Sequence, residues 1–172
     1  MIPSSSSLQA VGGREDRAEG VSNGRPAVDR EDQPPAGSAL SAGPIDMAGM
    51  LARAHHPGAG AVVLFSGEVR DSNLGRTVAF LEYEAYAPLA DRLIAEILTM
   101  AKEKWGLHIA FAQHRTGRVA VGDTAVVVIT ASAHRSEAYA ANRYIIDRIK
   151  HEAPIWKCEH YADGGSEWGN KC

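Results

Sequence analysis

The alternation of apolar and polar positions along the chain predicts strands of two kinds. Residues 60–69 (GAVVLFSGEV) and 124–132 (TAVVVITAS) contain runs that are apolar on both faces, which is typical of strands in the interior of a sheet. Gly67 interrupts the first run and indicates a bulge or a close approach by another backbone. Residues 78–86 alternate instead, which indicates a strand with one face partly in water. Shorter extended segments are expected at 107–114, 118–121, 155–161 and 166–168.

Apolar residues at helical spacing predict one short and two long helices. The short helix is expected within 44–56, where Pro44 suits a helix start and Asp46 suits a cap. The long helices are expected at 88–105 and 135–152. About three helices, with strands that arrive partly as neighbours joined by turns, favour an α+β fold with a mixed or largely antiparallel sheet. The stripe expected to be buried in the second helix is Leu89, Leu93, Ile97, Met100 and Ala101.

Residues 1–43 differ in composition from the rest of the chain and are expected to form a disordered tail. Ser, Gly and Pro supply 18 of the first 44 positions, and the first aromatic residue is Phe65. Such a segment buries too little apolar surface to offset the entropy lost on ordering. We therefore expect one domain over residues 44–172, and weak pairing or none for residues 37–45.

Composition and charge narrow the classes of function. The 172 residues carry a formal net charge of −3, which argues against a protein that coats nucleic acid. The two cysteines, Cys158 and Cys172, do not suggest a disulfide framework, and a reducing cytoplasm is the expected compartment. No apolar run approaches the ~20 residues that cross a bilayer, so no membrane association is expected.

Basic side chains stand at the ends of predicted elements, in a pattern that suits an anion-binding site. His134 and Arg135 follow a strand and open a helix, where unpaired backbone N–H groups and the helix dipole attract negative charge. Lys150 lies at the end of that helix, Lys157 in the next strand and Arg70 at the end of an apolar strand. Each has a structural alternative, such as a solvated side chain, a helix C-terminal cation, a guard of a sheet edge or an ion pair. Convergence of several would favour a site, because structural needs seldom gather like charges.

Two short clusters of potential metal ligands carry little weight. Cys158 and His160 are separated by one residue, and His55 and His56 are adjacent, but no second ligand pair accompanies either cluster. A structural zinc site uses four ligands in recognisable pairs. No metal is therefore expected.

Five stretches of the sequence together resemble one known family. They are GAVVLFSGEVRDSNLG (60–75), LEYEAY (81–86), HRTGRVAVGD (114–123), SAHRSEAY (132–139) and the segment from Lys150 through APIWK (153–157). The chain resembles the catalytic, or large, subunit family of molybdopterin synthase over about residues 44–168. The joint occurrence of FxGxVR, SAHR and K-x-x-A-P-[IF]-W-K is highly specific.

That resemblance implies an α/β hammerhead-type fold and a homodimer. It implies that a small ubiquitin-like sulfur-carrier subunit with a C-terminal Gly-Gly docks on each protomer, which makes a heterotetramer. The implied reaction adds two sulfurs from the carrier's thiocarboxylate to cyclic pyranopterin monophosphate, which becomes molybdopterin. No cofactor is implied, because the partner supplies the sulfur, and neither cysteine of this chain need act as a nucleophile.

The resemblance also implies a set of site residues. Lys150 is expected to be the principal acid/base or carbonyl-activating group, and Lys157 to orient the substrate and stabilise charge. His134 and Arg135 are expected to serve either their own pocket or that of the partner protomer. The residues expected to line the substrate pocket are Glu68, Val69, Arg70, His134, Arg135, Lys150, Lys157, Cys158 and Glu159.

Two functions of other classes stay open on the sequence. One is a non-catalytic module that binds an anionic ligand, and the other is a structural adaptor whose helices bind partners. A degenerate enzyme would lack Lys150 or Lys157, and this chain has both, which favours the enzyme.

Overall fold

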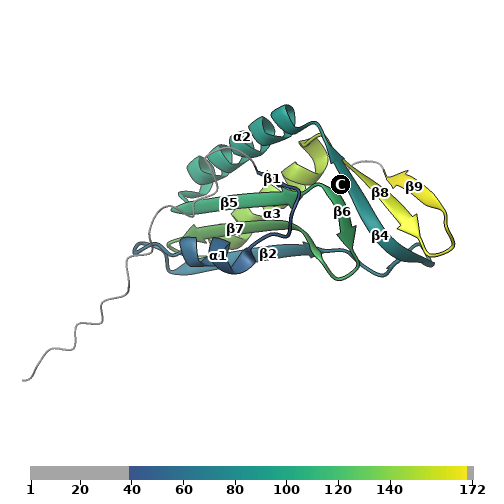
Figure 1. Cartoon of the computed structure of the whole chain (residues 1–172). Helices are drawn as coiled ribbons and strands as arrows, with labels where there is room; N and C mark the ends of the chain where they lie inside the picture. The colour runs from purple at the N-terminus through teal and green to yellow at the C-terminus, as the bar shows by residue number, and fades with distance from the viewer. Residues whose placement is uncertain (1–38, 170–172) are drawn as a thin grey trace, which may run out of the picture. The chain divides into compact units, whose positions relative to one another are not determined.

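The computed structural model describes residues 39–169, which lie within the compact unit Pro34–Cys172 (Figure 1). The predicted disordered tail lies outside these residues, except for its last five positions. In chain order the elements are β1 (Leu40–Ser41), α1 (Met47–Arg53), β2 (Ala61–Glu68), β3 (Ser72–Asn73), β4 (Arg76–Ala85), α2 (Ala87–Trp105), β5 (Ile109–Arg115), β6 (Gly117–Ala120), β7 (Thr124–Ser132), α3 (Arg135–Glu152), β8 (Ile155–Tyr161) and β9 (Ser166–Gly169).

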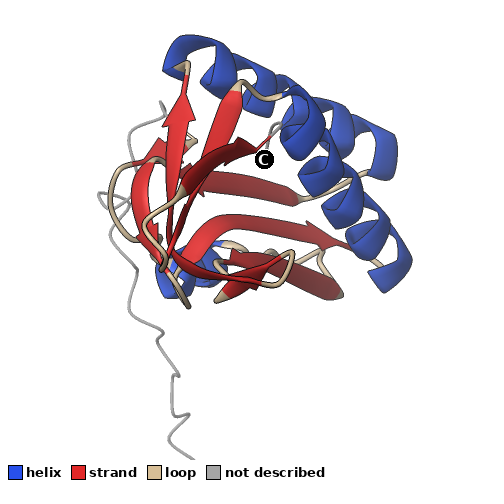
Figure 2. Ribbon diagram, turned by 90° about the vertical axis from the view of Figure 1, so that its right-hand side faces the viewer, coloured by secondary structure: helices blue, strands red, loops and turns tan. Residues whose placement is uncertain are grey.

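Two sheets make up the domain, and together with three helices they confirm the predicted α+β fold. The first sheet has the strand order β1-β5-β7-β2, in which β7 runs antiparallel to both neighbours. The second has the order β3-β4-β8-β9, with β6 also paired to β4, and all its pairings are antiparallel. The long helices α2 and α3 pack on each other along one side of the strands (Figure 2). None of the described helices has the length and apolar character needed to cross a bilayer.

The two apolar strands occupy different positions in the first sheet. β7 is central, as predicted, and every residue after its first is buried. The prediction that β2 is central is wrong, because β2 is the last strand of its sheet and Leu64 is 37% exposed. Its two apolar faces have another cause, since Val62 packs on the small core beneath α1 and Phe65 packs on the main core. An apolar strand at a sheet edge is a liability unless another chain covers it.

Capping groups determine where the first two helices begin and end. α1 begins at Met47 rather than at Pro44, because the Asp46 carboxylate accepts a hydrogen bond from the Gly49 N–H at 2.9 Å. α2 ends at Trp105, and its C-cap Gly106 adopts φ 60° in the left-handed region that favours glycine. Both helices are therefore bounded by local chemistry that is readable in the sequence.

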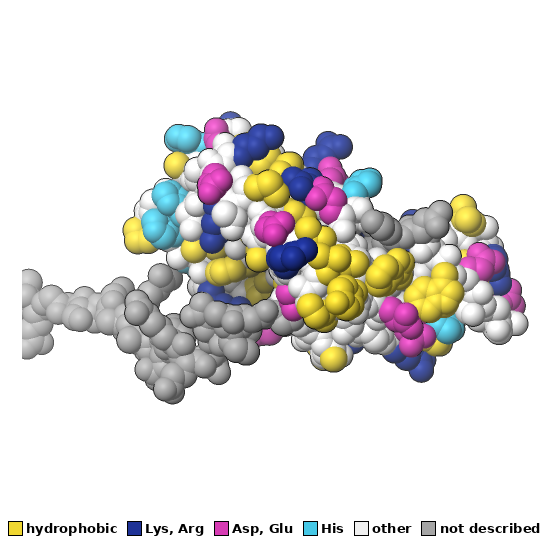
Figure 3. All heavy atoms as spheres, turned by 90° about the horizontal axis from the view of Figure 1, so that it is seen from above, with side chains coloured by type: hydrophobic (Ala, Val, Ile, Leu, Met, Phe, Trp, Pro, Cys, Tyr) yellow, Lys and Arg dark blue, Asp and Glu magenta, His cyan; other side chains and the backbone are white. Residues whose placement is uncertain are grey.

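The buried face of α2 is rotated by about one position from the predicted stripe. The residues that it buries are Ala90, Ile94, Ile97 and Ala101. Leu89 and Leu93 are only partly buried, and Met100 is 38% exposed. Both sets repeat at helical spacing, so periodicity cannot choose between them, whereas the small Ala90 and Ala101 let the helix approach its neighbours closely. α2 thus keeps apolar side chains on its outer side, where Figure 3 shows a band of them.

A short parallel pairing places the start of the folded domain before residue 44. β1 lies beside β5, with Leu40 opposite His114. The Ala39 N–H also donates to the Asp91 carboxylate at 2.7 Å. Because these backbone groups find partners, the last residues of the predicted tail belong to the domain. The pairing is two residues long, in keeping with the weak pairing expected for this segment.

A buried amide ties α3 to the first sheet. Asn142 is 4% exposed, and its Nδ2 lies 3.2 Å from the Val63 carbonyl and 3.1 Å from the Val128 carbonyl. The Thr130 hydroxyl adds a bond from β7 to the helix by donating to the Ala138 carbonyl at 2.9 Å. These bonds hold the helix in one position over β2 and β7.

We expect Asn142→Ala to lower the free energy of unfolding by about 2 kcal/mol, because buried carbonyls lose their donor. The measurement is urea denaturation at one fixed protein concentration, since any self-association would make stability concentration-dependent. The matched control is Glu103→Ala on the exposed side of α2, which should change stability by less than about 0.5 kcal/mol. Equal effects of the two substitutions would show that the amide does not anchor the helix.

Candidate functional site

One pocket gathers charged side chains from separate segments of the chain. Glu68 ends β2, Arg70 follows it, Lys150 lies in the last turn of α3, and Lys157 and Glu159 lie in β8. The uncharged lining residues are Gly67, Ser72, Asn73, Val78, Leu81, Tyr83, His114, Ala125 and Val126. The pocket therefore lies where the ends of β2, β5 and β7 meet the second sheet.

A bulge at the end of β2 directs the chain into this pocket. A Cβ atom on Gly67 would lie 2.7 Å from Val126 Cγ1, so β2 has no room for a side chain there. The register between β2 and β7 shifts between Gly67 and Glu68, which confirms the predicted bulge. Beyond it, the Val69 N–H donates to the Asp123 carbonyl at 3.0 Å. This local geometry brings Arg70 to the same pocket as the second sheet.

Glu159 is the buried carboxylate of the pocket, with a side chain 8% exposed. It accepts hydrogen bonds from Lys157 at 2.8 Å, from the Asn73 amide at 2.7 Å and from the Tyr161 hydroxyl at 3.0 Å. Burial by itself would raise the pKa of this carboxyl, but the donors, Lys157 first, outweigh it, and the pKa lies below its ordinary value. Glu159 is thus ionised and holds the Lys157 ammonium group in place.

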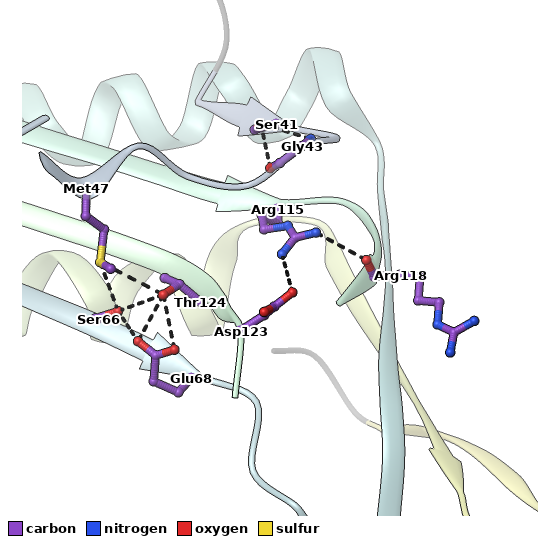
Figure 4. Close-up of polar contacts among 9 residues, drawn as sticks. All are labelled: Ser41, Gly43, Met47, Ser66, Glu68, Arg115, Arg118, Asp123 and Thr124. Carbon is purple, nitrogen blue, oxygen red and sulfur yellow. Dashed lines mark hydrogen bonds and ion pairs between the residues drawn. The ribbon is translucent and has the colours of Figure 1, made fainter. Parts of the chain in front are cut away.

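Glu68 is the second carboxylate of the pocket and is held by hydroxyl groups. Thr124 Oγ1 lies 3.0 and 3.1 Å from its two oxygens, and the Ser66 hydroxyl also donates to it (Figure 4). Glu68 is exposed, unlike Glu159. Its charge therefore stands at the mouth of the pocket, where water screens it.

His114 is a pocket residue that sequence reasoning missed. It is 3% exposed, and its ring meets the Tyr83 ring edge-on, with centroids 5.0 Å apart. Burial, and to a smaller extent the charge of Lys150, lower the pKa of His114 from 6.5 to about 4 despite a bond to the Arg115 carbonyl, which raises it. His114 is therefore neutral at neutral pH. It opens the HRTGRVAVGD stretch, but a lone histidine in a strand carries no pattern of its own.

Arg115, next to His114, fixes this part of the backbone. It is 7% exposed, and its guanidinium lies 3.2 Å from the Asp123 carboxylate and 3.4 Å from the Arg118 carbonyl (Figure 4). Both partners belong to the segment between β5 and β7. Because its side chain is anchored, Arg115 is fixed in position, and so is its carbonyl, which contacts His114.

Two residues expected in the pocket lie elsewhere. Val69 is 2% exposed and packs in the main core. Cys158 is 3% exposed and lies on the face of β8 opposite to Lys157 and Glu159, because side chains alternate along a strand. Burial raises the pKa of the Cys158 thiol, and the charges of nearby carboxylates raise it further. Cys158 is therefore a protonated, packed thiol.

His134 and Arg135 are also absent from the pocket lining of their own chain. Both are exposed and lie at the N-terminal end of α3, whereas Lys150 lies in its last turn. α3 has 18 residues and is therefore about 27 Å long at 1.5 Å per residue. The structure thus brings together Glu68, Arg70, Lys150, Lys157 and Glu159 and leaves this pair at the far end of the helix.

The low pKa of His114 predicts how stability depends on pH. The pKa of His114 in the folded chain is about 4, below its ordinary 6.5. The contribution of neutral His114 to the free energy of unfolding is therefore complete above pH 6.5 and is lost as the pH falls towards 4. Relative to His114→Gln, the wild-type chain should lose about 2 kcal/mol between pH 7.5 and pH 5. Urea denaturation of both proteins across this range measures the difference, and a constant difference would contradict the prediction.

Comparison with known proteins places the chain in a family. The family model described as MoaE protein matches residues 40–152. The molybdopterin synthase catalytic subunit of Nostoc sp. (strain PCC 7120) is 43% identical over 131 residues, which is 76% of this chain and 79% of that protein. The protein of the same name from Staphylococcus carnosus (strain TM300) is 46% identical over 113 residues, or 66% of this chain and 75% of the other.

Solved structures agree with the fold. The crystal structure of molybdopterin synthase from Staphylococcus aureus superimposes with a TM-score of 0.73 at 40% identity, covering 77% of this chain and 96% of that one. A complex of subunits 1 and 2 of molybdopterin-converting factor from Helicobacter pylori 26695 shares the fold, with a TM-score of 0.64 at 22% identity, covering 76% and 88%. The chain therefore belongs to the MoaE family of molybdopterin synthase catalytic subunits, which are enzymes of molybdenum cofactor biosynthesis.

Proposed function

We propose that this chain adds two sulfurs to cyclic pyranopterin monophosphate, taking each from the C-terminal thiocarboxylate of a small carrier protein. The observation that carries the proposal is the meeting of Arg70, Lys150 and Lys157 in one pocket. Three cations from separate segments suit a phosphate-bearing substrate and an anionic sulfur donor. A module that only binds an anion would need no pair of lysines at the reacting centre.

The two lysines have different surroundings and hence different roles. Lys157 is fixed by its 2.8 Å bond to Glu159, so it orients the substrate and stabilises negative charge. Lys150 lies in the same pocket beside the neutral His114 and acts as the acid/base or carbonyl-activating group. Attack by a thiocarboxylate produces tetrahedral oxyanions, which such cations stabilise as they form.

The sulfur comes from outside this chain. The pocket lining contains no cysteine among residues 39–169, and the Cys158 thiol is buried on the other face of β8 with a raised pKa. Cys172 lies outside the described residues. A donor that brings its sulfur on a narrow Gly-Gly terminus meets this requirement, and the Helicobacter pylori protein of the same fold was solved as a complex of two subunits.

A homodimer completes the site in this proposal. β2 is the edge strand of its sheet, it is apolar, and within residues 39–169 only β7 pairs with it. Its first residue, Ala61, lies opposite Ser132 near His134, and its last, Glu68, lines the pocket. If two β2 edges meet antiparallel about a two-fold axis, His134 and Arg135 of one protomer approach the pocket of the other. Two carriers on such a dimer make a heterotetramer.

We expect Lys150→Ala to reduce the rate of product formation at least ~100-fold, because the chemical step loses its proton-transfer group. The assay supplies preformed thiocarboxylated carrier and cyclic pyranopterin monophosphate and measures dithiolene product. Lys102→Ala, an equal charge change on the exposed surface of α2, is the matched control and should keep full activity. Near-normal turnover by Lys150→Ala would remove the assignment.

Cys158→Ala should keep near-normal sulfur transfer in the same assay, because the thiol is buried away from the pocket. Loss of transfer from a preformed thiocarboxylate, in a variant whose thermal stability matches wild type, would mean that this thiol carries sulfur.

Mixed dimers distinguish a shared site from a self-contained one. The activity of the Lys150→Ala variant alone and of the Arg135→Ala variant alone is compared with that of an equal mixture of the two. If sites are shared, a mixed dimer has one intact site and one doubly damaged site, so random mixing should restore about a quarter of wild-type activity. If each site is built within one chain, every protomer is damaged and mixing restores nothing.

A further inference from the structure

The hydrogen bonds of His114 determine which of its nitrogens carries the proton. Nδ1 lies 2.8 Å from the Arg115 carbonyl oxygen, which can only accept a hydrogen bond, so Nδ1 must donate. That carbonyl is held in place by the Arg115 side chain, which is anchored on Asp123 (Figure 4). In the neutral ring Nε2 is then an acceptor without a proton.

The ring of His114 forms part of the pocket wall. His114 lines the same pocket as Lys150 and Lys157. Within residues 39–169 the hydrogen bond recorded for the His114 ring is that of Nδ1 to the Arg115 carbonyl. Because Nδ1 is turned to the backbone and the ring lines the pocket, Nε2 is the ring atom that remains for a bound molecule.

The surroundings of His114 keep this acceptor neutral. The cations that face the pocket are Arg70, Lys150 and Lys157, and the carboxylates are Glu68 and Glu159. The Glu159 carboxylate is already occupied by three donors, one of them Lys157. Since burial and Lys150 both oppose a second positive charge, the ring does not become a donor at neutral pH. A further carboxylate would repel an anionic substrate, whereas a neutral imidazole does not.

We propose that His114 is a substrate-contacting residue of this pocket whose Nε2 accepts a hydrogen bond from an N–H group of the bound reduced pterin ring. The inference rests on the proposed function for the identity of the substrate. It assigns recognition of the ring to a neutral acceptor and recognition of the anionic groups to Arg70, Lys150 and Lys157. His114 thereby selects a ring rich in N–H donors over a phosphate ester without them.

Nitrogen NMR of the protein without substrate tests the tautomer directly. With ¹⁵N-labelled histidine, His114 should show a protonated Nδ1 and an unprotonated Nε2 at pH 7, the reverse of the tautomer favoured by free histidine. Addition of cyclic pyranopterin monophosphate without carrier should shift the Nε2 resonance. A protonated Nε2, or a resonance unmoved by bound substrate, would overturn the inference.

Two amide substitutions distinguish the role of Nδ1 of His114 from that of Nε2. In His114→Gln the side-chain oxygen can reach the position of Nε2, whereas in His114→Asn the amide replaces only Nδ1 and its bond to the Arg115 carbonyl. By calorimetry under anaerobic conditions, His114→Asn should weaken substrate binding about tenfold, and His114→Gln should stay within about threefold of wild type. The matched control is Gln113→Asn on the same strand, outside the pocket lining, which should bind like wild type.

The outcomes distinguish this inference from the proposed function. If wild type binds the pterin and His114→Asn binds equally well, the inference alone fails. If wild type does not bind the pterin, both fail. The ratio of kcat/KM between wild type and His114→Asn should not change from pH 5.5 to 7.5, because His114 does not titrate there. A ratio that rises through a pKa near 6.5 would instead make His114 a titrating base and overturn the inference.

Discussion

Like charges in one pocket repel, and the site depends on how this chain offsets that repulsion. Arg70, Lys150 and Lys157 come from separate segments of the chain. Water partly screens their repulsion, because Arg70 and Lys150 are exposed and Lys157 is partly buried. Glu159 offsets part of this repulsion, because it is a buried, ionised carboxylate that accepts hydrogen bonds from three donors. Glu68 adds a screened negative charge at the mouth. Cations still outnumber carboxylates in the lining, so the pocket favours an anionic ligand.

The second constraint is the rigidity and length of α3. Asn142 fixes the helix over β2 and β7, and this places Lys150 at the pocket. The same helix carries Arg135, with His134 just before it, about 22 Å from Lys150 at 1.5 Å per residue. One rigid element thus presents cationic groups at two distant ends. A pocket that uses both ends requires two copies of the chain, and the apolar edge strand β2 lies alongside the whole distance.

The two faces of β8 have different roles, because one lines the pocket and the other packs against neighbouring side chains. Lys157 and Glu159 project to the pocket, whereas Cys158 lies on the other face and His160 stacks on Phe80, with centroids 4.2 Å apart. The Cys-x-His fragment is therefore part of the packing of a sheet, because alternation sends its side chains away from the reacting groups. The proposed sulfur transfer would gain from this arrangement, since a reactive thiol in the pocket would compete with the donor.

The sequence by itself determined the long strands, the three helices and the α+β class, because capping residues and apolar periodicity act locally along the chain. It also singled out Arg70, Lys150 and Lys157, which the fold gathers in one pocket. It also located the bulge at Gly67. Only the tertiary structure decided that β2 is an edge strand, which face of α2 is buried, and that Val69 and Cys158 lie outside the pocket. Only it revealed His114, whose neutral state follows from burial and from Lys150. These properties depend on neighbours that are distant in sequence, and no local pattern of residues encodes them.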